Sequence, residues 1–121
     1  MKAPALSEAQ IQQQVRSYLA ALSIDAIHVP NGAVLAGDGK QRAMQMNALK
    51  KAGVLPGMAD LILFDRRARR VGFMEVKSEG GTISPAQDAF ADLAEKVWHL
   101  PYAVVRSTED TAQALHQWGW R

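Results

Sequence analysis

The 121-residue chain contains no cysteine, which excludes both a disulfide framework and a thiolate metal site. Its three histidines are scattered and have no zinc-ligand spacing, so we expect any bound metal to be a hard cation with oxygen ligands. The sequence lacks an apolar run near the roughly 20 residues of a membrane span. Residues 1–6 lack an apolar signal region. We therefore expect a soluble, cytoplasmic protein with no membrane partner.

The chain has no glycine-rich phosphate loop of the Walker type, which argues against nucleotide hydrolysis of that kind. The net charge is only +2, but it is unevenly distributed. Residues 40–70 hold eight basic and two acidic side chains, a local charge of +6, whereas six basic and ten acidic ones give −4 elsewhere. A basic middle fits a polyanionic partner, and it equally fits a solvated charged face. The candidates for contact with a nucleic-acid backbone are Lys40, Arg42, Lys50, Lys51, Arg67 and Arg70.

Length and a hydrophobic content of 48% are typical of a single domain with its own core, here residues 1–121. Ser7 and Gln10 form a capping-box pattern that opens a helix, and Pro30-Asn31-Gly32 is a turn signal. A mixed sheet between helices, and so an α/β fold, is the expected packing of the elements. The patterns predict helices over residues 7–22, 40–52 and 109–118, a helix from residue 84, and strands over residues 25–29, 60–65, 70–77 and 102–106.

The helix that begins at residue 84 has a second capping box. Ser84 is its cap, Pro85 occupies the first helical position, and Gln87 completes the box. Apolar residues at helical spacing predict which face is buried. This predicted stripe consists of Ala86, Phe90, Leu93, Ala94 and Val97.

The two central strands are joined by a short connection, which predicts a hairpin. A symmetric turn pairs Asp65 with Arg70, and the same register places Asp60 opposite Glu75. Directly opposed side chains have Cβ atoms about 4.5–5.5 Å apart and point to one face. Lys77 shares that face because side chains alternate along a strand. A one-residue bulge would change this register.

Two carboxylates placed in this way repel each other, and the penalty grows in an apolar sheet. A divalent cation with oxygen ligands would offset the repulsion. Lys77 can offset part of the charge, orient a water molecule, or stabilise negative charge on a phosphate. The alternative is a simple ion pair between Lys77 and Glu75 or Asp60 at the end of the sheet.

Asp60 followed by Glu75-Val76-Lys77, in this order of elements, resembles the PD-(D/E)xK nuclease superfamily. More narrowly, residues 6–106 are similar to a stand-alone VRR-NUC domain, the virus-type replication and repair nuclease. The resemblance implies a restriction-endonuclease-like core with a central mixed β-sheet flanked by helices. It rests on six segments in order: Ser7-Glu8-Ala9-Gln10, Val29-Pro30-Asn31-Gly32, residues 49–53, Gly57-Met58-Ala59-Asp60-Leu61, Met74-Glu75-Val76-Lys77 and Ser84-Pro85-Ala86-Gln87.

The resemblance assigns roles to the motif residues. It implies that Asp60, Glu75 and the main-chain carbonyl of Val76 bind Mg²⁺ or Mn²⁺, and that Lys77 is the catalytic lysine. The chain departs from the family where Ala59 replaces the usual proline before the motif aspartate. Proline fixes a backbone angle but supplies no ligand, so we expect catalysis to survive with a looser strand entry.

Two further residues gain roles from the resemblance. It places Glu8 near the metal, as a possible further ligand, and Gln87 close to the catalytic centre. From the residues alone, Glu8 is a favourable acid at a helix N-terminus and Gln87 is a capping residue. Asn31 is interpreted as a turn residue, and Glu79 as an exposed strand end.

The resemblance implies a metal-dependent endonuclease that hydrolyses DNA phosphodiester bonds, with selectivity for four-way junctions or other branched DNA. Stand-alone members are similar to phage or bacterial enzymes of replication, recombination and repair. Two alternatives are a non-catalytic nucleic-acid-binding module with this fold and a hydrolase of another phosphate substrate. The resemblance also points to a homodimer, whose two-fold symmetry suits a four-way junction. Apolar candidates for contact between two copies are Val34, Leu35, Met44, Met46, Trp118 and Trp120.

Overall fold

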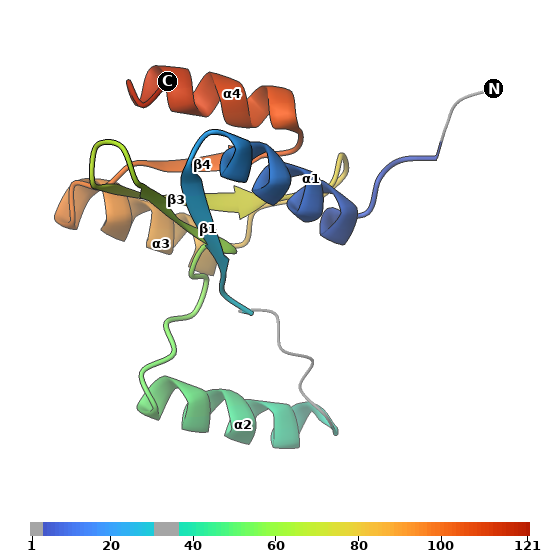
Figure 1. Cartoon of the computed structure of the whole chain (residues 1–121). Helices are drawn as coiled ribbons and strands as arrows, with labels where there is room; N and C mark the ends of the chain where they lie inside the picture. The colour runs from blue at the N-terminus through green and yellow to red at the C-terminus, as the bar shows by residue number, and fades with distance from the viewer. Residues whose placement is uncertain (1–3, 31–36) are drawn as a thin grey trace.

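The computed structural model describes residues 4–30 and 37–121. Four strands form one sheet in the order β1-β2-β3-β4 (Figure 1). The first two pairings are antiparallel and the β3–β4 pairing is parallel, so the predicted α/β fold with a mixed sheet is confirmed. The strands are β1 (Ile24–His28), β2 (Leu61–Asp65), β3 (Arg70–Val76) and β4 (Tyr102–Val105).

Helices cover both faces of the sheet (Figure 1). On one face, α1 (Glu8–Ala21) and α4 (Thr108–Gln117) pack over a core that includes Leu19, Leu61, Met74 and Leu115. On the other face, α3 (Pro85–Asp92) and the π-helix η1 (Leu93–Val97) enclose Ala59, Phe73, Phe90 and Ala94. None of the helices in the described part of the chain is both long enough and apolar enough to cross a membrane.

The predicted hairpin register is confirmed. Asp65 pairs with Arg70 and the ladder continues without a bulge to Leu61 and Met74. The predicted strand bounds were one residue too long at the functional end, since β2 begins after Asp60 and β3 ends before Lys77. Asp60 therefore lies at the entry to the ladder, where its side chain is free to turn toward the neighbouring strand.

The predicted buried stripe of the helix after Ser84 was right for Phe90 and Ala94, which are buried. It was wrong for Ala86 and Val97, which are exposed. The reason for Val97 is the change to π-helix. The Trp98 N–H donates to the Leu93 carbonyl at 3.1 Å, five residues back, so the last turn is wider than an α-helical turn. This widening moves Val97 off the buried face.

Helix α2 (Gly39–Lys51) buries none of its residues and stands apart from the sheet in Figure 1. It starts at a capping box formed by Asp38 and Gln41, a signal that the sequence analysis missed. Met44 is 62% exposed on this helix. The calls on Asn31, and on Val34 and Leu35 as contacts between copies, lie outside the described residues.

The last residues of the chain belong to the core. Trp120 is 5% exposed and stacks edge-to-face on Trp118. The buried carboxylate of Asp65 accepts hydrogen bonds from Arg121 at 2.9 Å and from Arg70 at 3.0 Å. The two tryptophans therefore pack at the end of the chain, and the buried Trp120 is not available for the predicted contact with a second copy.

Candidate active site

Asp60 is held by contacts with two neighbouring strands. Its main-chain carbonyl accepts a hydrogen bond from the Val29 nitrogen at 2.7 Å, just beyond β1. Its carboxylate accepts one from the Val76 nitrogen at 2.8 Å, at the end of β3. The preceding Ala59 is fully buried. These contacts fix the entry to β2 without the proline that the family usually has there.

The main-chain carbonyl of Val76 points toward the Asp60 side of β3. In an extended strand, the N–H and C=O groups of one residue point to the same edge. The Val76 N–H bonds Asp60, whereas the Lys77 N–H bonds Val105 on the opposite edge at 3.1 Å. The carbonyl of Val76 is therefore on the correct edge to act as an oxygen ligand beside Asp60.

Glu75 is a buried carboxyl group with one satisfied oxygen. The side chain is 2% exposed, and its Oε1 accepts a hydrogen bond from Gln87 Nε2 at 2.9 Å. Its Oε2 is buried and has no hydrogen-bond partner among the described residues. Burial and the negative charge of Asp60 together raise the pKa of Glu75 to about 8, while the positive charge of Lys77 opposes the shift. Without a cation, Glu75 therefore holds a proton at neutral pH.

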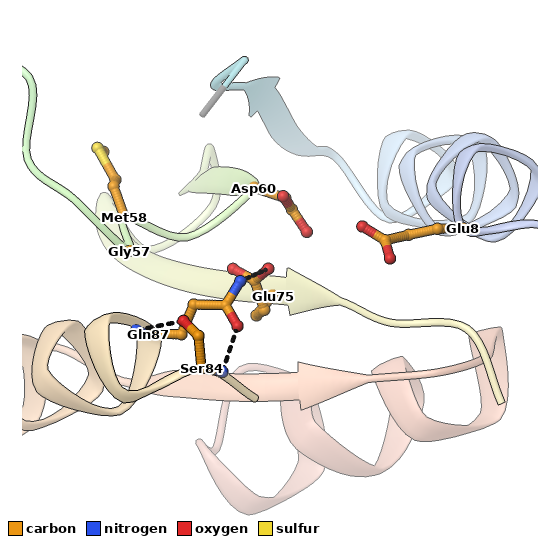
Figure 2. Close-up of a pocket in the computed structure, with 7 residues that line it drawn as sticks. All are labelled: Glu8, Gly57, Met58, Asp60, Glu75, Ser84 and Gln87. Atoms are coloured by element: carbon orange, nitrogen blue, oxygen red, sulfur yellow. Dashed lines mark hydrogen bonds between the residues drawn. The ribbon is translucent and has the colours of Figure 1, made fainter. Parts of the chain in front are cut away.

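The predicted residues meet at one pocket of about 270 Å³, shown in Figure 2. Glu8 projects from the first turn of α1 toward Asp60, and Glu75 lies on β3 between Asp60 and Gln87. Lys77 lies beside them, with Nζ 3.9 Å from Glu75 Oε1. We call this space the catalytic pocket; its lining residues are Glu8, Gly57, Met58, Asp60, Glu75, Ser84 and Gln87.

Gln87 has both of the roles that the sequence left open. Its Oε1 accepts a hydrogen bond from the Ser84 nitrogen at 2.9 Å, as a capping box requires, while its Nε2 donates to Glu75. The start of α3 comes this close because Gly57 has φ 73° and a Cβ at that position would collide with the main chain of Ala86. Sequence analysis missed Ser84, Gly57 and Met58 as pocket residues, although the sequence contains both the helix cap at Ser84 and a turn signal at Pro56-Gly57.

The oxygen donors in the catalytic pocket fit a hard divalent cation. The described residues contain no group of three acidic or histidine side chains gathered closely enough to hold an ion. Asp60, the unsatisfied Oε2 of Glu75 and the Val76 carbonyl nevertheless supply oxygen ligands, and Mg²⁺ commonly keeps several waters in such sites. Glu8 lines the same pocket from the opposite side (Figure 2).

The structure separates the basic candidates into two groups. Both chain connections to α2 leave the sheet at the end where Asp60 lies, one after β1 and one before β2. The second group is in the β2–β3 turn, at the opposite end of β3 from Glu75. There Arg67 is exposed, and Arg70 is bonded to Asp65 and lies 5.3 Å from the Trp120 ring. The exposed α2 group consists of Lys40, Arg42, Lys50 and Lys51.

Comparisons with known proteins agree with this geometry. A solved structure described as a VRR_NUC domain protein matches with a TM-score of 0.64 and 17% sequence identity, over 95% of this chain and 89% of that one, and this similarity supports the fold. No curated protein matches the chain. The family model of the VRR-NUC domain matches residues 7–109. The chain therefore belongs to the VRR-NUC family of nuclease domains.

Proposed function

We propose that this chain is an endonuclease that hydrolyses DNA phosphodiester bonds with the help of Mg²⁺ or Mn²⁺. The observation that carries the proposal is the buried Glu75 carboxyl group, whose Oε2 has no hydrogen-bond partner among the described residues and which shares a pocket with Asp60. An unsatisfied buried carboxyl oxygen is costly in a purely structural role. Membership of the VRR-NUC family supports the same activity.

The side chains of the catalytic pocket would divide the work. Asp60, Glu75 and the Val76 carbonyl would bind the cation, with Glu8 as a further ligand from across the pocket. A bound cation would polarise the scissile phosphate and favour ionisation of a water molecule. Lys77 has a side chain only 13% exposed, so its charge is poorly screened and would stabilise negative charge developing on the phosphate.

Gln87 would orient Glu75, to which it donates a hydrogen bond at 2.9 Å. Because its own amide oxygen is fixed by the Ser84 nitrogen, the amide group cannot rotate without breaking the cap. The Glu75 carboxyl group is thereby held in one orientation before any cation or substrate arrives. Such support of a ligand is a common requirement of metal sites.

The proposal also specifies a substrate and an oligomeric state: the substrate is branched DNA, and the chain acts as a homodimer. A helix of 13 residues that buries no side chain is marginal by itself, so α2 would gain stability from a partner. Met44 is exposed there, and Val54 and Leu55 after the helix are exposed as well. A second copy packed on this segment would place two catalytic pockets about a two-fold axis, as paired cuts in a four-way junction require. The proposed setting is phage or bacterial DNA replication, recombination or repair in the cytoplasm.

The test is incubation of the purified chain with four-way, flapped and linear DNA in the presence of Mg²⁺, Mn²⁺ or EDTA. We expect paired nicks in opposite arms of the four-way junction with either metal and none with EDTA, and a particle of twice the 13.2 kDa chain mass by light scattering. Glu75→Gln is the matched inactive control. DNA binding without cleavage under all metal conditions would instead support a non-catalytic binding module, and cleavage in EDTA would refute the metal mechanism.

A further inference from the structure

A second pocket has a volume of about 330 Å³. It is lined partly by the same two segments of the chain as the catalytic pocket, which places the two pockets close together. At the start of α1, Glu8 lines the catalytic pocket and Ile11, one turn later, lines the second one. Along the chain that leaves β3, Glu75 lines the first pocket and Glu79 the second. We call this space the side pocket; its lining residues are Leu6, Ile11, Glu79, Arg106 and Ser107.

The side pocket combines an apolar wall with a fixed cation. Leu6 is 43% exposed, whereas Ile11 belongs to the buried core. Arg106 Nη1 donates to the Ser78 carbonyl at 2.6 Å and, weakly, to the Glu79 carbonyl at 3.5 Å. The other N–H groups of this guanidinium have no hydrogen-bond partner among residues 4–30 and 37–121, so its plane is oriented while donors remain available.

The composition of the side pocket favours a nucleobase over a phosphate. Flat bases pack against apolar side chains and stack on guanidinium planes, whereas a phosphate would be repelled by the exposed Glu79 carboxylate that lines the pocket. That carboxylate can instead accept a hydrogen bond from an exocyclic amino group of a base. The volume of about 330 Å³ is in the range of small-ligand pockets.

We propose that the side pocket binds the unpaired base of the nucleotide next to the scissile phosphate. The inference rests on the proposed nuclease function, because it places the base by reference to the cut bond. A base that is already unpaired at a flap or branch point enters without the cost of unpairing and unstacking. The side pocket would thereby make cleavage selective for branched DNA, independently of the number of copies in the assembly.

The experiment uses a set of flapped DNAs, each with a single 2-aminopurine. The 2-aminopurine replaces the nucleotide immediately before the cut bond in one DNA and the nucleotide immediately after it in another. The complex is formed in EDTA, so that binding is observed without cleavage. None of the described residues that line the side pocket is aromatic, so an unstacked 2-aminopurine held there stays bright. We expect at least a threefold rise in fluorescence at one position, and loss of most of that rise in Leu6→Asp and Arg106→Gln. Arg16→Gln, an exposed position on α1, is the matched charge control and should behave as wild type.

The outcomes separate this inference from the proposed function. Circular dichroism shows whether each variant is folded, and Leu6→Asp provides a test even if Arg106→Gln loses its contact with Ser78 and unfolds. DNA that is cut with Mg²⁺ but shows no fluorescence rise at any position refutes the side-pocket proposal alone. An equal rise in wild type and in folded Leu6→Asp refutes it as well. DNA that is not cut with any metal refutes the proposed function and the side-pocket proposal together.

Discussion

The carboxylate of Asp60 accepts a hydrogen bond of 2.8 Å from the main-chain nitrogen of Val76. This bond joins the entry of β2 to the last residue of β3, the two segments that provide the proposed metal ligands. One carboxylate oxygen of Asp60 is thus occupied by a main-chain donor, and the other can face a cation. The contact orients the ligand set within the protein itself, before any metal binds.

The contact between Asp60 and Val76 leads to a prediction for two substitutions at one position. Asp60→Asn keeps an oxygen acceptor for the Val76 N–H, so we expect a stable fold and at least a hundredfold loss of cleavage. Asp60→Ala also removes the acceptor and should lower the free energy of unfolding by about 1 kcal/mol relative to Asp60→Asn. Single-turnover cleavage and urea denaturation measure the two effects. Cleavage by folded Asp60→Asn at the wild-type rate would remove Asp60 from the site.

Substitutions of Gln87 and Ser84 can separate the positioning of Glu75 from the capping of α3. Gln87→Leu removes the donor to Glu75 Oε1. We expect a roughly 10- to 100-fold loss of activity or metal affinity, as is typical when the partner of a ligand is lost. Ser84→Ala removes the cap, at a cost of about 1 kcal/mol, but keeps the contact between Gln87 and Glu75. Metal titration by calorimetry should therefore show weakened binding in the first variant only; equal weakening in both would assign Gln87 a purely structural role.

The raised pKa of Glu75 predicts a pH dependence of stability in EDTA. The folded protein keeps the Glu75 proton up to about pH 8, whereas the unfolded chain loses it near the ordinary carboxyl pKa. Because the unfolded state binds fewer protons in this window, the free energy of unfolding should fall as the pH rises from the ordinary carboxyl range to about 8. Glu75→Gln should be less pH-dependent over the same window in urea denaturation. Identical pH profiles for the two proteins would contradict the burial of an uncompensated Glu75.

Local signals were enough to predict the register that opposes Asp60 and Glu75. The short turn fixed the pairing of Asp65 with Arg70, and alternation then placed Lys77 beside Glu75. Capping boxes marked the starts of α1 and α3 for the same reason, since the signal lies within four residues of the chain. Features encoded by neighbouring residues were therefore predictable, although the same kind of signal at Asp38 and Gln41 was missed for α2.

Features that depend on packing between distant segments were not predictable. The family resemblance placed Gln87 near the catalytic centre, but its contact with Glu75 requires α3 to approach the sheet, which depends on the left-handed conformation of Gly57. The exposure of Val97 follows from a π-turn that helical periodicity does not reveal. The isolation of α2 could not be predicted, because its weak pattern fits a helix that packs elsewhere as well as one that is poorly packed.

Because the buried Asp65 carboxylate is paired with arginines, we predict that the protein loses stability in acid. The carboxylate accepts hydrogen bonds from Arg121, Arg70 and the Arg67 nitrogen, and these contacts, led by Arg121, hold the pKa of Asp65 well below its ordinary value. The associated stability is present above the ordinary carboxyl pKa and is lost as the pH falls through the lower, folded-state value. Asp65→Asn removes the negative charge that pairs with Arg121 and Arg70, whose side chains are 17% and 37% exposed, and should cost about 1–3 kcal/mol at neutral pH. Urea denaturation measures this cost, and a change below 1 kcal/mol would contradict it.

The position of α2 near the Asp60 end of the sheet predicts which basic residues contact DNA. Each phosphate neutralised on duplex DNA contributes a slope of about −0.9 to the dependence of log K on log salt. Lys50→Glu with Lys51→Glu should therefore flatten the slope by up to about 1.8 if both residues contact the backbone. Fluorescence anisotropy with labelled four-way DNA in EDTA measures the slope without cleavage.

Arg67→Glu with Arg69→Glu is the matched control for the α2 pair. It makes the same change in net charge, but at the exposed turn between β2 and β3, on the opposite end of β3 from Glu75. Long-range effects of net charge would act on both pairs alike, whereas direct phosphate contacts at the catalytic end would act on the α2 pair alone. A slope that flattens only in the turn variant would show that DNA binds along the opposite end of the sheet, and would require a second copy of the chain to bring that turn near a catalytic pocket.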